Sequence, residues 1–81
     1  MTVKEFIVNQ LVEVYMLWPE QADIVVNSIQ SEIVGLVKWN DPVDGYLPPI
    51  INMLLFMAKQ KAIEWLEANQ PKSIAIQMLK A

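Results

Sequence analysis

Apolar residues recur at helical spacing along almost the whole of this 81-residue chain, and prolines interrupt that pattern at three places. Residues three or four positions apart share one face of an α-helix, so this period predicts amphipathic helices. Proline ends a helix or occupies its first turn, and it therefore marks the boundaries between helices. The interruptions are Pro19, the segment 42–49 and Pro71. This pattern predicts an all-α fold in a single helical domain covering residues 1–81.

The expected architecture is a small bundle of three main helices plus a short C-terminal helix or extended segment. The three main helices are expected at residues 3–18, 19–39 and 49–69. Thr2 and Glu5 have the spacing of a capping box, which predicts the start of the first helix. The tail from Lys72 to Ala81 fits either a helix or a strand, because Ile74 and Met78 match both periods. We prefer the helix, since a lone strand needs an edge from another chain.

The chain carries more apolar residues than one small core needs. Hydrophobic residues make up 54% of it and charged residues only 19%, against about 25% charged in an average domain. The first helix and the N-terminal half of the third are apolar around most of their circumference, which predicts that something covers both sides of them. The candidate interface residues are Phe6, Met16, Leu17, Met53, Phe56 and Met57. The alternative is that the same residues fill the core of the bundle.

Composition argues against several functions. The chain has no Cys and no His, so it lacks the commonest metal ligands and the commonest general base near neutral pH. All six cations are scattered lysines and the net charge is −3, which argues against nucleic acid as a partner. We therefore expect no catalytic residues, no metal, no cofactor and no enzymatic activity.

A membrane role is not expected either. The longest apolar stretch, residues 47–58, is too short for the roughly 20 residues that span a bilayer. The N-terminus enters an amphipathic pattern at once and does not resemble a signal peptide. A cytoplasmic location is therefore the default expectation.

The turn-rich connection before the third helix is a second candidate site. Trp39, Asp41, Asp44 and Tyr46 form a candidate binding loop, in which two carboxylates are flanked by two aromatic rings. It lacks the number of ligands of a calcium loop. The alternative is ordinary turn chemistry, with Trp39 and Tyr46 packing over the core.

Several short motifs carry a family resemblance. They are Trp39-Asn40-Asp41, Asp44-Gly45-Tyr46, Lys59 or Lys61 followed by Ala62-Ile63-Glu64-Trp65-Leu66-Glu67-Ala68-Asn69, and Pro71-Lys72. In these motifs the chain resembles small phage- or prophage-encoded proteins of unknown function. The likeness covers the C-terminal half best, and it departs from the pattern at Ser73-Ile74-Ala75-Ile76, where an aromatic, basic tail is expected. The resemblance implies a viral context and no particular activity.

These observations give one leading hypothesis for the function and two alternatives. The leading hypothesis is a non-enzymatic protein-interaction module that forms a homo-oligomer, expected to be a dimer, through apolar faces of the first and third helices. The first alternative is a phage-type inhibitor that binds a host protein, with the tail added as a strand. The second is a small-molecule sequestering protein with a pocket between helices.

Overall fold

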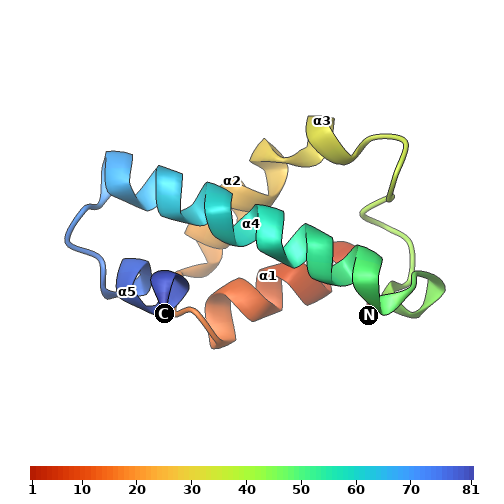
Figure 1. Ribbon diagram of the computed structural model, residues 1–81, viewed down its shortest axis with the longest axis horizontal. Coiled ribbons are helices and arrows are strands. Elements are labelled where there is room, and N and C mark those ends of the chain that lie inside the picture. Colours follow the sequence, from red (N-terminus) through yellow and green to blue (C-terminus); the bar gives the residue numbers. More distant parts are fainter.

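The computed structural model describes all 81 residues and confirms the all-α class (Figure 1). Its elements are α1 (Val3–Glu13), α2 (Pro19–Ser28), α3 (Gln30–Ile33), the 3-10 turn η1 (Val43–Gly45), α4 (Pro48–Asn69) and α5 (Ile74–Lys80). The 22-residue α4 is the longest helix and packs against α1, α2 and α5. The tail is helical, as preferred from its sequence. No helix has the length and hydrophobicity needed to cross a membrane.

The first helix is shorter than its apolar pattern predicts. It was expected to reach Trp18, but α1 ends at Glu13. Met16 adopts a left-handed conformation, with φ at 65°, and the chain turns back there. The amide of Leu17 then donates to the carbonyl of Leu11 at 3.0 Å, which fixes the turn. Because of this turn, Leu17 enters the core and Trp18 points away from it.

The second helix is interrupted where one continuous helix was expected. The Ser28 hydroxyl donates to the carbonyl of Val25 at 2.6 Å, a local bond that competes with the backbone ladder. Ile29 leaves helical geometry, and α3 adds only a single further turn. Gly35 then takes a φ of 91°, so residues 34–39 form a connection rather than the end of a helix. In a helix continuing to residue 39, Leu36 would share a face with the buried Ile29 and Ile33, but in the structure it is exposed.

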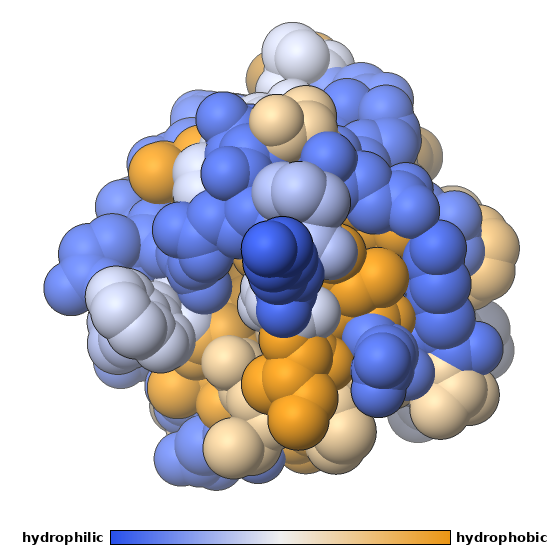
Figure 2. Space-filling model, turned by 90° about the vertical axis from the view of Figure 1, so that its left-hand side faces the viewer, coloured by the Kyte–Doolittle hydropathy of each residue, from blue (hydrophilic) through white to orange (hydrophobic).

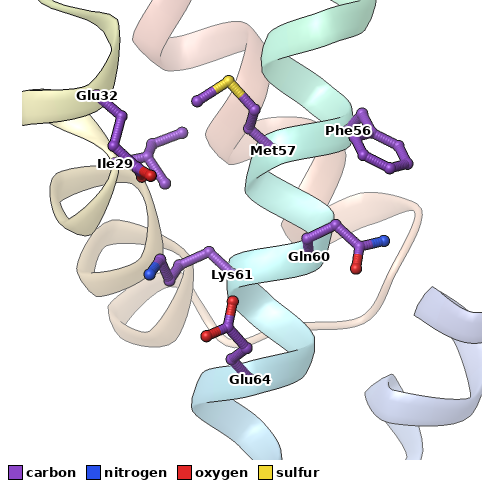
Figure 3. Close-up of a pocket in the computed structure, with 7 residues that line it drawn as sticks. All are labelled: Ile29, Glu32, Phe56, Met57, Gln60, Lys61 and Glu64. Atoms are coloured by element: carbon purple, nitrogen blue, oxygen red, sulfur yellow. The ribbon is translucent and has the colours of Figure 1, made fainter.

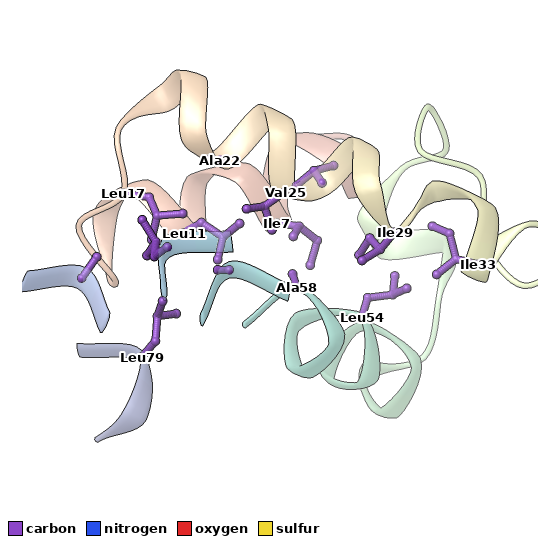
Figure 4. Close-up of a cluster of buried hydrophobic side chains, with 14 of the residues drawn as sticks. Ile7, Leu11, Leu17, Ala22, Val25, Ile29, Ile33, Leu54, Ala58 and Leu79 are labelled. Atoms are coloured by element: carbon purple, nitrogen blue, oxygen red, sulfur yellow. The ribbon is translucent and has the colours of Figure 1, made fainter. Parts of the chain in front are cut away.

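One hydrophobic core joins the long helices (Figure 4). It contains 18 buried residues: Val3, Ile7, Leu11, Leu17, Ala22, Val25, Val26, Ile29, Ile33, Val37, Ile51, Leu54, Ala58, Ala62, Leu66, Ala75, Ile76 and Leu79. The positions from α4 follow one helical stripe, and two of them are alanines. Such small side chains let α1 and α2 approach the axis of α4 closely.

The apolar circumference of α1 is explained by its neighbours. This helix packs against both α2 and α4, so two of its sides are covered. Phe6, Val8, Val12 and Tyr15 are partly buried and pack against the core. The hydrophobic excess of the first helix therefore belongs largely to the interior of the molecule.

Candidate interaction surfaces

The outer face of α4 carries apolar side chains that no other element covers. In Figure 1 this helix lies in front of α1 and α2, and its outer side is open. Phe56 is 62% exposed and Met53 is 42% exposed, and both lie in the N-terminal half of this long helix. Gln60 is exposed one turn further on. We call Met53, Phe56 and Gln60 the α4 surface.

A shallow cavity adjoins this surface (Figure 3). It has a volume of about 190 Å³ and is lined by Ile29, Glu32, Phe56, Met57, Gln60, Lys61 and Glu64. Met57 and Lys61 point toward the junction of α2 and α3, whereas Phe56 and Gln60 point to the opposite side of α4. The cavity is therefore a seam between α4 and its neighbours, and Phe56 borders it from the outer side of α4.

The ammonium group of Lys59 does not extend over the apolar part of the α4 surface. The Lys59 ammonium group lies 4.8 Å from the centre of the Tyr15 ring, a cation–π contact on the side of α1. This contact keeps the nearest lysine of that side directed at α1 instead of lying across Phe56. The charged groups that remain near Phe56 are those of Glu32, Lys61 and Glu64, which line the adjoining cavity.

The six candidate interface residues do not form one surface. Met53 and Phe56 are exposed together on α4, and Met57 beside them is partly buried. Phe6 lies elsewhere: it is partly buried and lines a hollow of about 460 Å³ with Val43, Asp44, Tyr46, Pro48, Ile51 and Asn52. Met16 is exposed in the α1–α2 connection. Leu17 is only 2% exposed, so its place is in the core and it is not available to a partner.

The candidate binding loop serves as a cap for α1. The carbonyl of Asp41 accepts from the amide of Val3 at 2.9 Å, and the carbonyl of Trp39 accepts from the amide of Lys4 at 3.1 Å. The first amides of a helix have no partners within it, so these two bonds satisfy groups that α1 leaves free. The rings of Trp39 and Tyr46 pack against the core. The carbonyl groups and aromatic rings of the loop are thus already engaged in contacts within this chain.

The two carboxylates of this loop do not converge. The Tyr46 hydroxyl donates to Asp41 at 2.5 Å and accepts from the amide of Lys38 at 3.2 Å. Its bond to Asp41 raises the pKa of Tyr46 above the usual value. Asp44 lies apart and exposed in η1. Nowhere in the structure do three or more acidic, His or Cys side chains gather as a metal site.

A second apolar area covers one end of the molecule. It consists of five large exposed side chains from the α1–α2 connection and from α5: Val14, Met16, Trp18, Ile74 and Met78. We call this set the end surface. Leu17 of the connection and Leu79 of α5 both enter the core at this end of the molecule (Figure 4). Viewed from this end, apolar areas lie between hydrophilic ones in the lower half of the molecule (Figure 2).

The end surface is held by a buried amide. The Gln21 side-chain oxygen accepts from the amide of Trp18 at 2.9 Å, and its nitrogen donates to the Gln70 side chain at 2.7 Å. These bonds fix the start of α2 against the residue that follows α4. The α1–α2 connection is therefore tied to the same end of α4 from which the chain turns into α5.

Sequence reasoning missed most of the end surface. A first helix that continues to Trp18 places this residue on one face with Ile7 and Leu11, whereas in the structure it lies beyond α1 and is exposed. Its position before Pro19 is the signal that was available, since a residue before proline is disfavoured in helical geometry. Ile74 and Met78 were recognised as sharing a helix face, but nothing in the pattern shows that this face is the outer one.

Comparison with models of protein families, with curated proteins and with solved structures gives no match to this chain.

Proposed function

We propose that this chain is a non-enzymatic protein-interaction module that associates with a second copy of itself through the α4 surface. The observation that carries the proposal is the exposure of Phe56, at 62%, halfway along the longest helix. An aromatic ring there has a large apolar area in contact with water, and burying it is favourable. The core beneath it is complete without it.

The helix geometry supports a symmetric pair. Phe56 lies near the middle of α4, so a twofold axis beside it would bring the ring close to Phe56 of the partner copy. Met53 would then lie against the far side of that ring. A methionine adapts its shape to an aromatic neighbour, which favours such a contact. The sequence predicts an interface formed by the first and third helices. We propose an interface of α4 alone, because α2 and α4 cover α1 within the subunit.

The proposal of a non-enzymatic function rests on the structural roles of the ionisable side chains with shifted pKa values. Two ionisable side chains have clearly shifted pKa values, those of Glu5 and Tyr46. Glu5 caps α1, and Tyr46 holds the loop through Asp41. Both groups are accounted for by local structure, and neither stands beside a second group with a shifted pKa.

The test is the molar mass of Phe56→Glu in solution. We expect the unmodified chain to form a concentration-dependent dimer in light scattering coupled to size exclusion, because the ring is buried on association. The variant should be monomeric, since a carboxylate at the centre of the interface repels its symmetry mate. Its helical circular dichroism should stay unchanged, because position 56 is exposed in the monomer.

Two controls separate this result from general effects of charge or unfolding. Ile74→Glu places the same charge on another exposed apolar residue and should leave the dimer intact. Leu54→Ala empties a fully buried position and should cost stability, about 3–5 kcal/mol. A monomeric unmodified chain at hundreds of micromolar, or a dimer that survives Phe56→Glu, would contradict the proposal.

A further inference from the structure

The turn that ends α1 joins two parts of the molecule that are each firmly anchored. On one side, the apolar face of α1 is buried against α2 and α4. On the other side, Leu17 enters the core, and Trp18 is extended, with ψ at 151°, before Pro19. The amide of Trp18 also donates to the side-chain oxygen of Gln21 at 2.9 Å. The change of chain direction is therefore confined to residues 14–16, which we call the hinge.

The hinge holds a conformation that its sequence does not favour. Met16 lies in the left-handed region, with φ at 65°, which is costly for a residue with a Cβ atom. Methionine is a good helix former, and the apolar helical period continues from Val14 to Trp18. Neither glycine nor asparagine, the usual left-handed residues at helix ends, lies in the hinge. The hinge is therefore strained when it is closed, and opening it releases that strain.

One hinge connects α1 with all of its neighbours, because α1 is the first of the elements. The helix packs against α2 and α4, and the carbonyls of Trp39 and Asp41 accept from its first amides. Tyr15, within the hinge, lies under the Lys59 ammonium group of α4 at 4.8 Å. A second copy of the chain presents the same α2, α4 and loop, so it can receive α1 with every one of these contacts.

We infer that two copies of this chain exchange α1 through the opened hinge. Each copy then places its first helix in the core of the other, so that the buried contacts are kept and the hinge alone changes. Opening releases the left-handed strain once in each copy, which favours the exchanged pair. The lost independent motion of the two copies opposes it, so the exchange depends on concentration. This pair is distinct from the one proposed through the α4 surface, which leaves the hinge closed.

The test starts from Phe56→Glu, so that the α4 surface contributes no association. This chain is unfolded in urea and refolded at millimolar and at micromolar concentration. We expect a dimer from the millimolar sample only, because a short connection holds the two parts of one chain at an effective concentration of about that order. The dimer should persist on dilution, since α1 must leave the core before the copies separate. In a mixture of isotope-labelled and unlabelled chains, NMR contacts between α1 and α4 should join different copies.

Substitutions at Met16 separate strain from other causes. Met16→Gly removes the strain of the closed hinge, so it should lower the yield of dimer about tenfold. Met16→Ala keeps a Cβ atom and should refold with the yield of the starting chain. Monomer alone from the millimolar sample, α1–α4 contacts that all lie within one copy, or equal yields from the two variants would each overturn the inference.

The same experiment distinguishes failure of this inference from failure of the proposed function. A dimer of Phe56→Glu that dissociates at once on dilution, with α1–α4 contacts within each copy, contradicts both proposals. A lasting dimer with contacts between copies supports the exchange of α1, whatever the unmodified chain does through α4. A dimer of the unmodified chain that is lost in Phe56→Glu under every refolding condition supports the α4 surface and overturns the exchange.

Discussion

Glu5 and Thr2 exchange hydrogen bonds at the start of α1. The Glu5 carboxylate accepts from the amide of Thr2 at 2.9 Å, and the Thr2 hydroxyl accepts from the amide of Glu5 at 3.2 Å. With the loop carbonyls that receive the amides of Val3 and Lys4, the free amides at this helix end are all satisfied. The capping box is closed by its own two residues, and a loop distant in the sequence satisfies the two amides that lie between them.

This arrangement predicts a specific loss of stability in acid. The bond from the Thr2 amide, and then the one with its hydroxyl, lowers the pKa of Glu5 from the ordinary 4.5. A carboxylate with a lowered folded-state pKa adds stability that is present above the unfolded pKa and is lost as the pH falls through the folded one. We therefore expect the unfolding free energy to decrease below about pH 4.5, partly through Glu5.

Urea unfolding at a series of pH values tests this prediction. Glu5→Gln keeps an acceptor for the Thr2 amide but cannot titrate, so its stability should fall less steeply over the same acid range. Thr2→Ala should cost about 1 kcal/mol near neutral pH through loss of the cap. If Glu5→Gln and the unmodified chain lose stability in parallel in acid, the Glu5 carboxylate is not responsible.

At the scale of the elements, the sequence shows where helices begin better than where they end. The capping box correctly places the start of α1, and prolines correctly place the starts of α2 and α4. Pro71 likewise follows the end of α4, and the tail is helical as preferred. Each of these signals is local, so it does not depend on what the rest of the chain does.

The helix ends that sequence reasoning misplaced have weaker local signals: Pro19 disfavours helical geometry only at Trp18, well beyond the end of α1, and Gly35 follows α3 without marking the earlier break at Ile29. The apolar pattern continues from Val14 to Trp18. A methionine does not predict a left-handed turn, because glycine or asparagine is usual at such positions. The break after Ser28 depends on which rotamer its hydroxyl takes. The same limit applies to the surfaces: burial of Leu17 and exposure of Trp18 both follow from that one turn.

The turn that ends α1 predicts a stabilising substitution. A left-handed residue other than glycine costs about 1–2 kcal/mol, and Met16 has a φ of 65°. Met16→Gly removes this cost but gives the unfolded chain more freedom, by about 0.5–1 kcal/mol. We expect a net gain of up to about 1 kcal/mol in the free energy of unfolding, measured by urea denaturation.

Met16→Ala is the matched control for that substitution. It removes the same exposed side chain but remains an L-residue with a Cβ atom, so it should bring no such gain. A glycine variant no more stable than the alanine variant would show that position 16 is not left-handed in solution.

At the scale of the whole molecule, the two surfaces face different directions. The α4 surface lies along the side of the long helix, and the end surface lies across α5 and the α1–α2 connection. A pair of subunits joined through α4 would leave an end surface free on each copy.

Self-association also bears on stability, because the chain has no disulfide to support its small core. Folding coupled to dimer formation makes the melting temperature depend on protein concentration. Each tenfold rise in concentration should add roughly 0.7 kcal/mol per chain when the dimer predominates. For a domain of this size, that corresponds to an increase of roughly 3–6 °C in the melting temperature.

Thermal melts followed by circular dichroism over a hundredfold range of concentration measure this effect. The unmodified chain should melt at progressively higher temperature, and Phe56→Glu should melt at one temperature throughout. Ile74→Glu should follow the unmodified chain, because the end surface takes no part in the proposed dimer. A flat response from the unmodified chain would mean that burial of Phe56 contributes nothing to its stability, and that the core alone holds the subunit together.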